Sequence, residues 1–240
     1  MTAKSLLKTL DYALLKPEVS MHALLHAAEL CEALGIKCLC VKSCDVPFAK
    51  ECLGDCDTLL AAVVGFPHGN TVGTLKAMEA QLASTAGADE IDMVINVSAL
   101  KDGDTESVED EIRAVVTAVY PKSVKVILET ALLTEPEMNK GVVCAIRAGA
   151  AFVKTSTGFN PAGGASPEAV RALVAAAEDK IEVKASGGIR TREDAEAYLE
   201  MGCTRLGVGN VLCLLSESEK KHLGLGTDEH DGAVCHCLEY

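Results

Sequence analysis

The chain has 240 residues, of which 49% are hydrophobic but only 3% aromatic, and its formal net charge is −13. This length favours one domain with a large core built from Ala, Val, Leu and Ile. The acidic balance opposes binding to nucleic acids and anionic membranes, so we expect neither as a partner.

Short apolar runs rich in β-branched residues alternate with amphipathic helical segments along the chain. The predicted strands, in order, are residues 9–14, 36–41, 59–64, 90–96, 124–129, 151–155, 181–185 and 204–208. The predicted helices between them include residues 21–34, 71–86, 105–119, 136–147, 167–178 and 192–201. The residues before the first strand are expected to form a short helix.

Alternation of strands and helices repeated eight times predicts a parallel sheet. In a chain of this length, eight such units favour closure into a single (β/α)8 TIM barrel, and a doubly wound open sheet is the alternative. We therefore expect one domain over residues 1–240, with a short N-terminal segment. The composition becomes loop-like from about residue 224, which predicts a mobile tail.

The 11 cysteines do not indicate a disulfide-stapled miniature fold, because the chain is long and its elements alternate regularly. We find neither a secretory signal nor an apolar run of membrane-spanning length, so we expect a cytoplasmic protein with reduced thiols. The segment Cys235-His236-Cys237 lacks a paired C-x-x-C spacing, and no metal site is predicted there.

Three lysines interrupt predicted strands: Lys125, Lys154 and Lys184. Burial of a lysine is costly unless it is paired or neutral, and two adjacent lysines disfavour each other's protonation. One reading is therefore a neutral amine that attacks a carbonyl compound. The other is an interior layer of salt bridges, in which acidic side chains neutralise the lysines: Asp92, Glu129 and Glu182. Spacing alone leaves both readings open.

Asp92 and several glycines complete the set of candidate site residues. A carboxylate in a strand either neutralises a lysine or relays protons, and the two roles are compatible. Glycine-rich segments follow three late strands, at residues 155–158, 186–190 and 207–210. Loops at these positions of a barrel supply backbone N–H groups to a phosphate. We interpret the pair Gly163-Gly164 as a plain flexible turn.

Seven motifs, in order along most of the chain, resemble deoxyribose-phosphate aldolase, a class I aldolase family. They are TLDYALLKP (9–17), CLCV (38–41), VVGFPHG (63–69), EIDMVIN (90–96), VKVILET (124–130), FVKTSTGF (152–159) and VKASGGIRT (183–191). The resemblance implies reversible cleavage of 2-deoxy-D-ribose 5-phosphate to acetaldehyde and D-glyceraldehyde 3-phosphate, in deoxyribose catabolism. It implies no metal and no other cofactor.

Carried over by motif, Lys154 is the Schiff-base lysine, Lys184 lowers its pKa, and Asp92 is the acid/base group, acting through a water molecule. Lys125 is a further catalytic residue. The predicted substrate- and phosphate-binding residues are Asp11, Cys40, Thr157, Gly158, Gly187, Gly188, Gly207, Gly209 and Asn210. In some relatives a C-terminal tyrosine assists proton transfer, and Tyr240 is the corresponding candidate. By analogy with other barrel enzymes, we expect a homodimer.

The sequence also departs from the family pattern at three places, Tyr12-Ala13, Lys42-Ser43 and Gly209-Asn210. We expect these changes to alter phosphate affinity, substrate preference or turnover. Two alternatives to the expected activity stay open. One is a Schiff-base aldolase for another sugar phosphate, and the other is an inactive barrel that serves as a binding protein.

Overall fold

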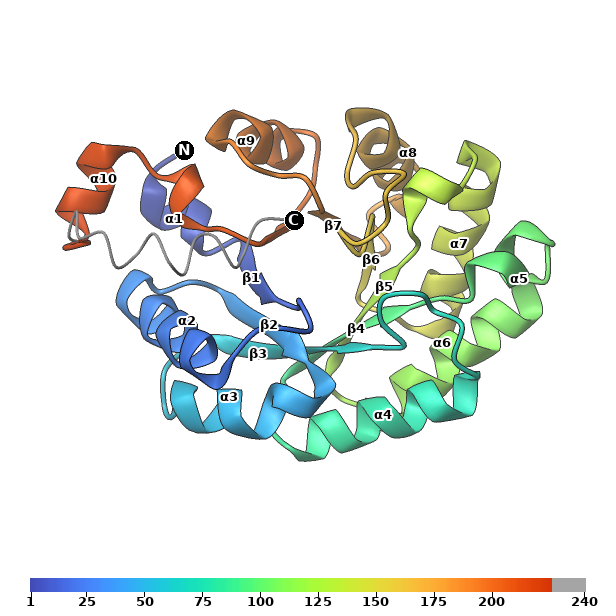
Figure 1. The fold of residues 1–240 in the computed structure, drawn as a ribbon. Coiled ribbons are helices and arrows are strands. Elements are labelled where there is room, and N and C mark those ends of the chain that lie inside the picture. The colour runs from blue at the N-terminus through green and yellow to red at the C-terminus, as the bar shows by residue number, and fades with distance from the viewer. Residues whose placement is uncertain (226–240) are drawn as a thin grey trace.

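The computed structural model of the protein describes residues 1–225. Within them, eight parallel strands close into a barrel in the order β1 to β8, as Figure 1 shows. The strands are β1 (Leu10–Leu14), β2 (Cys38–Lys42), β3 (Leu59–Val64), β4 (Glu90–Val94), β5 (Ser123–Ile127), β6 (Phe152–Lys154), β7 (Glu182–Ser186) and β8 (Arg205–Val208). The predicted TIM barrel is confirmed, and the open-sheet alternative is wrong.

Helices surround the barrel (Figure 1). They are α1 (Ala3–Leu7), α2 (Met21–Leu34), α3 (Val46–Leu53), α4 (Gly73–Thr85), α5 (Val97–Lys101), α6 (Thr105–Val119), α7 (Glu135–Ala148), α8 (Pro167–Ala177), α9 (Arg192–Glu200) and α10 (Glu217–His222). The predicted helices agree with these bounds to within two residues, and α1 confirms the short N-terminal helix. The sequence analysis missed the short helices α3, α5 and α10. None of the helices in residues 1–225 has the length and hydropathy to cross a bilayer.

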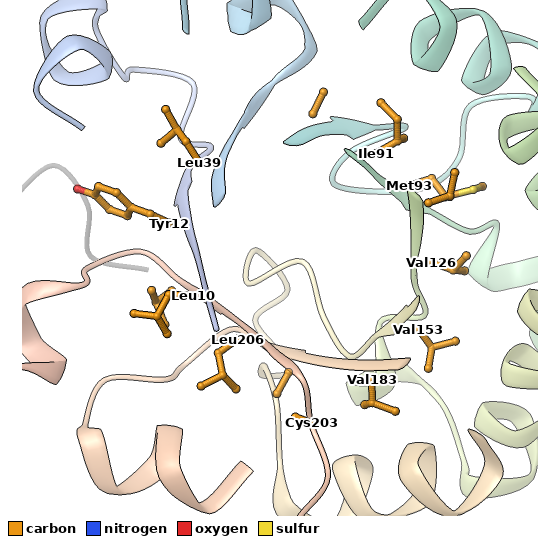
Figure 2. Close-up of a cluster of buried hydrophobic side chains, with 14 of the residues drawn as sticks. Leu10, Tyr12, Leu39, Ile91, Met93, Val126, Val153, Val183, Cys203 and Leu206 are labelled. Carbon is orange, nitrogen blue, oxygen red and sulfur yellow. The ribbon is translucent and has the colours of Figure 1, made fainter. Parts of the chain in front are cut away.

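Successive side chains along each strand point alternately toward the helices and into the barrel. Outward-facing side chains pack against the helices and form the main hydrophobic core, part of which Figure 2 shows. Examples are Tyr12, Leu39, Met93, Val153 and Leu206, all buried. Many of the inward-facing positions between them carry charged or small side chains instead. The barrel interior is therefore available for chemistry without loss of the core.

Three predictions concern residues that lie mostly or wholly outside residues 1–225. Most of the predicted mobile tail lies outside residues 1–225. The same is true of Tyr240 and of the Cys-His-Cys segment at residues 235–237.

Candidate active site

Charged side chains face into the barrel from six of its strands. Register places them side by side, because Asp92 is paired with Lys125, and Lys154 with Lys184. Side chains two positions away on the same strands also face into the barrel, because side chains alternate between the two faces of a strand. We call the whole set the barrel ion cluster: Asp11, Glu90, Asp92, Lys125, Lys154, Lys184 and Arg205. Each of these side chains is buried.

Asp92 is the centre of the barrel ion cluster. Its Oδ1 accepts a hydrogen bond from Lys125 Nζ at 2.8 Å. Its Oδ2 accepts from Lys154 Nζ and from Lys184 Nζ, each at 2.8 Å. Burial by itself would raise the pKa of Asp92, but the three ammonium groups outweigh it and hold the pKa well below its usual value. In the free protein Asp92 is therefore a carboxylate that the three lysines share.

A second group of contacts lies around Asp11 and Glu90. Arg205 donates to Asp11 through Nη1 and to Glu90 Oε1 through Nη2, the latter at 2.6 Å. Lys125 Nζ lies 2.6 Å from Glu90 Oε2 and 3.3 Å from Asp11 Oδ2. Lys184 also donates to Asp11 Oδ2. With Asp92 included, Lys125 contacts three carboxylates, whereas Lys184 and Arg205 contact two each.

Charge in the barrel ion cluster does not balance when every group is ionised. Three lysines and one arginine face three carboxylates, which gives 4 − 3 = +1. Lys154 has the fewest carboxylate contacts among the four, since its ammonium group is paired with Asp92 alone. Loss of one proton from Lys154 leaves three cations and three anions, so the cluster favours a neutral amine at this position.

The pKa shifts of the three lysines agree with this charge count. Burial lowers the pKa of Lys154, and the Lys184 cation lowers it further, against the opposing effect of Asp92. For Lys125 and Lys184, burial also acts to lower the pKa, but the surrounding carboxylates outweigh it and raise the pKa above its usual value. Lys154 therefore differs from its neighbours in the direction of its shift.

A pocket opens above the barrel ion cluster, and Lys154 and Lys184 lie in its wall. It gathers most of the predicted substrate-binding residues: Cys40, Thr157, Gly158, Gly187, Gly188, Gly207, Gly209 and Asn210. The remaining lining residues are Ala13, Leu15, Ser186, Ile189, Arg190, Val208 and Cys213. Segments that follow four strands thus meet at one site.

Glycine is required where these loops touch. A Cβ on Gly164 would lie 2.2 Å from the carbonyl oxygen of Gly187, so the interpretation of Gly163-Gly164 as a plain turn was wrong for Gly164, whereas Gly163 has open space around it. The backbone of Ala165 donates to that same oxygen at 3.0 Å. A Cβ on Gly207 would lie 2.7 Å from Ser186 Cβ and 3.3 Å from Lys184 Cε. These glycines let the chain pack closely around the pocket.

Comparison with known proteins then decides the family. Residues 4–215 match the model of the DeoC/LacD family aldolases. The chain belongs to the DeoC/LacD aldolase family. The deoxyribose-phosphate aldolase of Staphylococcus saprophyticus is 45% identical over 200 residues, which cover 83% of this chain and 90% of the relative. The Corynebacterium glutamicum enzyme of the same name is 42% identical, with 86% and 93% coverage.

Solved structures of aldolases have the same fold. An aldolase named QR15 superposes with a TM-score of 0.85 at 37% identity, covering 92% of this chain and 99% of its own. The deoxyribose phosphate aldolase from Aeropyrum pernix, described as having a unique tetrameric structure, gives a TM-score of 0.81 at 30% identity. The alignment covers 89% of this chain and 90% of that one.

The salt-bridge partners in this aldolase differ from those that the sequence suggested. Glu182 is exposed and accepts from Thr204 Oγ1 at 2.6 Å, while Glu129 accepts from Thr157. Neither forms a salt bridge to a barrel lysine. Glu90 and Arg205 take these places, and the sequence analysis missed both. Each lies two positions from a predicted site residue on its strand, a spacing that could have revealed them.

Asp11 also differs from its predicted role in binding substrate. Its side chain is 0% exposed and is enclosed by Lys125, Lys184 and Arg205 rather than lining the pocket. Asp11, Cys38 and Glu90 place ligand atoms within 4.8 Å of one another, as a metal site would. Lys125 and Arg205 already interact with both carboxylates, so these oxygens serve the cations of the protein.

Replacement of Asp11 tests whether the barrel ion cluster holds the fold together. In an Asp11→Asn variant, Lys184 and Arg205 remain charged but lose an anionic partner, and we expect a loss of about 3–5 kcal/mol in the free energy of unfolding. Urea unfolding followed by circular dichroism measures this loss. The matched control is Glu178→Gln, which breaks an exposed pair with Lys180 and should leave the unfolding midpoint nearly unchanged.

The pH dependence of unfolding gives a second readout of the same replacement. The folded-state pKa of Asp11 lies below its usual value, because the nearby cations outweigh burial. The unfolded chain therefore binds more protons, and the wild type loses stability as the pH falls below about 4. The Asp11→Asn variant should lose less over the same range. Equal slopes would contradict the assignment.

Proposed function

We propose that this aldolase reversibly cleaves 2-deoxy-D-ribose 5-phosphate to acetaldehyde and D-glyceraldehyde 3-phosphate through a Schiff base on Lys154. The observation that carries the proposal is the single surplus cation of the barrel ion cluster. Loss of one proton from the cluster removes this surplus charge and favours an uncharged amine on Lys154, which lies in the wall of the pocket. A neutral amine is the form of lysine that attacks a carbonyl carbon. The names of the relatives support the choice of substrate.

The reaction follows from that amine. Lys154 Nζ adds to the C1 carbonyl of the open-chain sugar, and loss of water leaves an iminium ion. The C3 hydroxyl then loses its proton, the C2–C3 bond breaks, and C3 becomes the aldehyde carbon of D-glyceraldehyde 3-phosphate. The electron pair of that bond moves toward C2 and forms an enamine. Protonation at C2 and hydrolysis release acetaldehyde and restore the amine.

Three further charged side chains support these steps. Lys184 lines the pocket, whereas Asp92 and Lys125 lie deeper in the barrel. Asp92 Oδ2 lies 2.8 Å from Lys154 Nζ and can accept the proton that the amine loses. Asp92 lies deeper than Lys154, so we propose that it exchanges protons with the substrate through a water molecule. Lys184 lines the pocket as a cation and keeps the pKa of Lys154 low. Lys125 holds Asp92 in place through Oδ1.

The phosphate group is proposed to bind at the glycine-rich end of the pocket. Gly187, Gly188, Gly207 and Gly209 line this wall together with Arg190, and their main-chain N–H groups are proposed to bind the phosphate. Backbone donors bind a small anion even in a chain with a net charge of −13, because they act only at short range. Asn210, which stands in place of the hydroxyl residue usual in the family, lines the same wall.

The proposed setting is deoxyribose catabolism in the cytoplasm, with no metal and no other cofactor taking part. The nine cysteines of residues 1–225 are all free thiols, which fits a reducing compartment. Five of them are buried and act as small apolar side chains.

Reductive trapping tests the covalent step directly. Borohydride added in the presence of acetaldehyde should reduce the Schiff base to a stable secondary amine, and peptide mass spectrometry should find the modification on Lys154. The Lys154→Ala variant should not be modified there and should lose cleavage of 2-deoxy-D-ribose 5-phosphate by at least a factor of about a thousand. An unmodified wild type would rule out the Schiff base. If Lys154 is modified but the protein cleaves only another sugar phosphate, the result would favour the alternative substrate.

The pH–rate profile tests the role of Lys184. A Lys184→Leu variant loses the cation that helps to lower the pKa of Lys154. Because the free amine is the reactive form, we expect slower turnover and an ascending limb of kcat/KM that is shifted to higher pH. Lys180→Leu, which removes an exposed lysine from the preceding loop, is the matched control. An unchanged profile in Lys184→Leu would contradict this role.

We further propose that two copies of the chain associate through the outer face of α4. Exposed large hydrophobic side chains recur there at helical spacing, at Val72, Leu75, Met78 and Leu82. The other exposed positions from 72 to 85 are Thr74, Gln81 and Thr85, so the whole face is uncharged. Copies that each carry a net charge of −13 repel one another, and a neutral face is where that repulsion is weakest. A second copy therefore fits this face better than a charged partner does.

Light scattering during gel filtration measures the oligomeric state. We expect the wild type to have twice the chain mass of 25.1 kDa, and the double variant Leu75→Glu, Leu82→Glu to have the mass of a single chain. The control Met21→Glu, Leu25→Glu changes an exposed apolar pair on α2 in the same way and should remain dimeric. A monomeric wild type, or an equal effect of both double variants, would refute the α4 interface.

A further inference from the structure

Glu129 is a buried carboxylate that the proposed reaction does not use. It follows β5 in the left-handed backbone region, with φ 59° and ψ 60°, which is unfavourable for a residue with a Cβ. Backbone bonds on both sides hold it there: Leu128 N donates to Lys154 O at 3.0 Å, and Thr130 N donates to Thr155 O at 2.9 Å. The chain thus directs Glu129 toward the loop that follows Lys154.

The Glu129 carboxylate binds Thr157 at two points. Oε1 accepts from Thr157 N at 3.2 Å, and Oε2 accepts from Thr157 Oγ1 at 2.5 Å. An ionised carboxylate can only accept hydrogen bonds, so the hydroxyl proton of Thr157 points toward Glu129. Thr157 Oγ1 also accepts from Phe159 N at 3.1 Å. A hydroxyl oxygen has two lone pairs, and one therefore remains for another donor.

The remaining lone pair gives the pocket a hydrogen-bond acceptor, whereas several other side chains that line the pocket are donors. Thr157 lines it together with Lys184 and Arg190, whose charged side chains only donate hydrogen bonds. Glycine-rich loops line the same wall. A sugar-derived aldehyde carries hydroxyl groups, which need acceptors as well as donors when they leave water. Thr157, with its own proton directed at Glu129, can meet this need.

We propose that Glu129 is a positioning residue that makes Thr157 a hydrogen-bond acceptor in the pocket, and so favours acceptor aldehydes that carry a hydroxyl group. The inference rests on the proposed aldolase function and adds a determinant of its specificity. Glu129 contacts Thr157 and acts on substrate only through it.

The Glu129→Gln variant should reverse the polarity of Thr157. The backbone N–H of Thr157 needs an acceptor, which keeps the amide oxygen at the Oε1 position and places the amide nitrogen against Thr157 Oγ1. The amide then donates to Thr157, whose proton turns toward the pocket. Two acceptors are compared in condensation with acetaldehyde: D-glyceraldehyde 3-phosphate and 3-oxopropyl phosphate, which lacks the hydroxyl. We expect their kcat/KM ratio to fall about tenfold, the loss of roughly one hydrogen bond.

Three further variants separate this role from a general loss of structure. Thr157→Val should lower the ratio as Glu129→Gln does, and the double variant should lower it no further, because both act through one hydroxyl. Thr157→Ser keeps the hydroxyl and should retain the preference. Glu79→Gln is the matched control, because Glu79 binds a hydroxyl and a backbone N–H in the same way, from Ser43 at 2.7 Å and Gly65 at 2.9 Å. It should leave the ratio unchanged.

The outcomes distinguish the two proposals. A wild type that condenses neither acceptor contradicts the proposed function. An active wild type with equal kcat/KM for both acceptors overturns the role of Glu129 alone. The same conclusion follows if Glu129→Gln lowers both values equally, or if Glu79→Gln changes the ratio as much.

Discussion

The structure depends on the burial of seven charged side chains within one barrel. Removing an ion from water is costly, so each charge must find partners of opposite sign inside. Asp92 meets this requirement for three lysines at once, while Asp11 and Glu90 hold Arg205 and share Lys125. Four cations and three carboxylates leave one positive charge without compensation. The amine with the fewest carboxylate contacts, Lys154, is the one whose pKa falls.

The same arrangement separates stability from reactivity along the barrel axis. Lys125 and Arg205 lie among carboxylates, and their pKa values are raised, so they remain charged. Lys154 lies one inward-facing position higher than Lys125 in the strand register, opposite Ile127 and at the pocket wall. Deep ion pairs thus hold Asp92 in position, and Asp92 in turn holds the amine that we propose to be reactive.

Hydrogen-bond polarity complements charge at the pocket wall. Lysine, arginine and the glycine loops offer donors, which suit a phosphate and a carbonyl oxygen. Sugar hydroxyls also need acceptors, and the pair of Glu129 and Thr157 supplies one through a hydroxyl whose proton is already committed. The left-handed backbone conformation of Glu129 directs its carboxylate to Thr157. A locally unfavourable conformation is therefore retained next to the site.

The sequence by itself determined the alternation of strands and helices, the bounds of the long helices, and the presence of lysines at inward-facing strand positions. These features depend on local periodicity, which is 3.6 residues for a helix and two for a strand. The motifs around Lys154 and Lys184 implied, through their resemblance to a known family, that the two side chains act together, but they did not give the full set of carboxylates around them. Only the tertiary structure decided which carboxylate meets which lysine. Spacing within a strand sets the face of a side chain, whereas its neighbours depend on the register between strands, which barrel closure imposes. For that reason Glu90 and Arg205 joined the cluster, Glu182 remained exposed at the start of β7, and Glu129 turned to Thr157 instead.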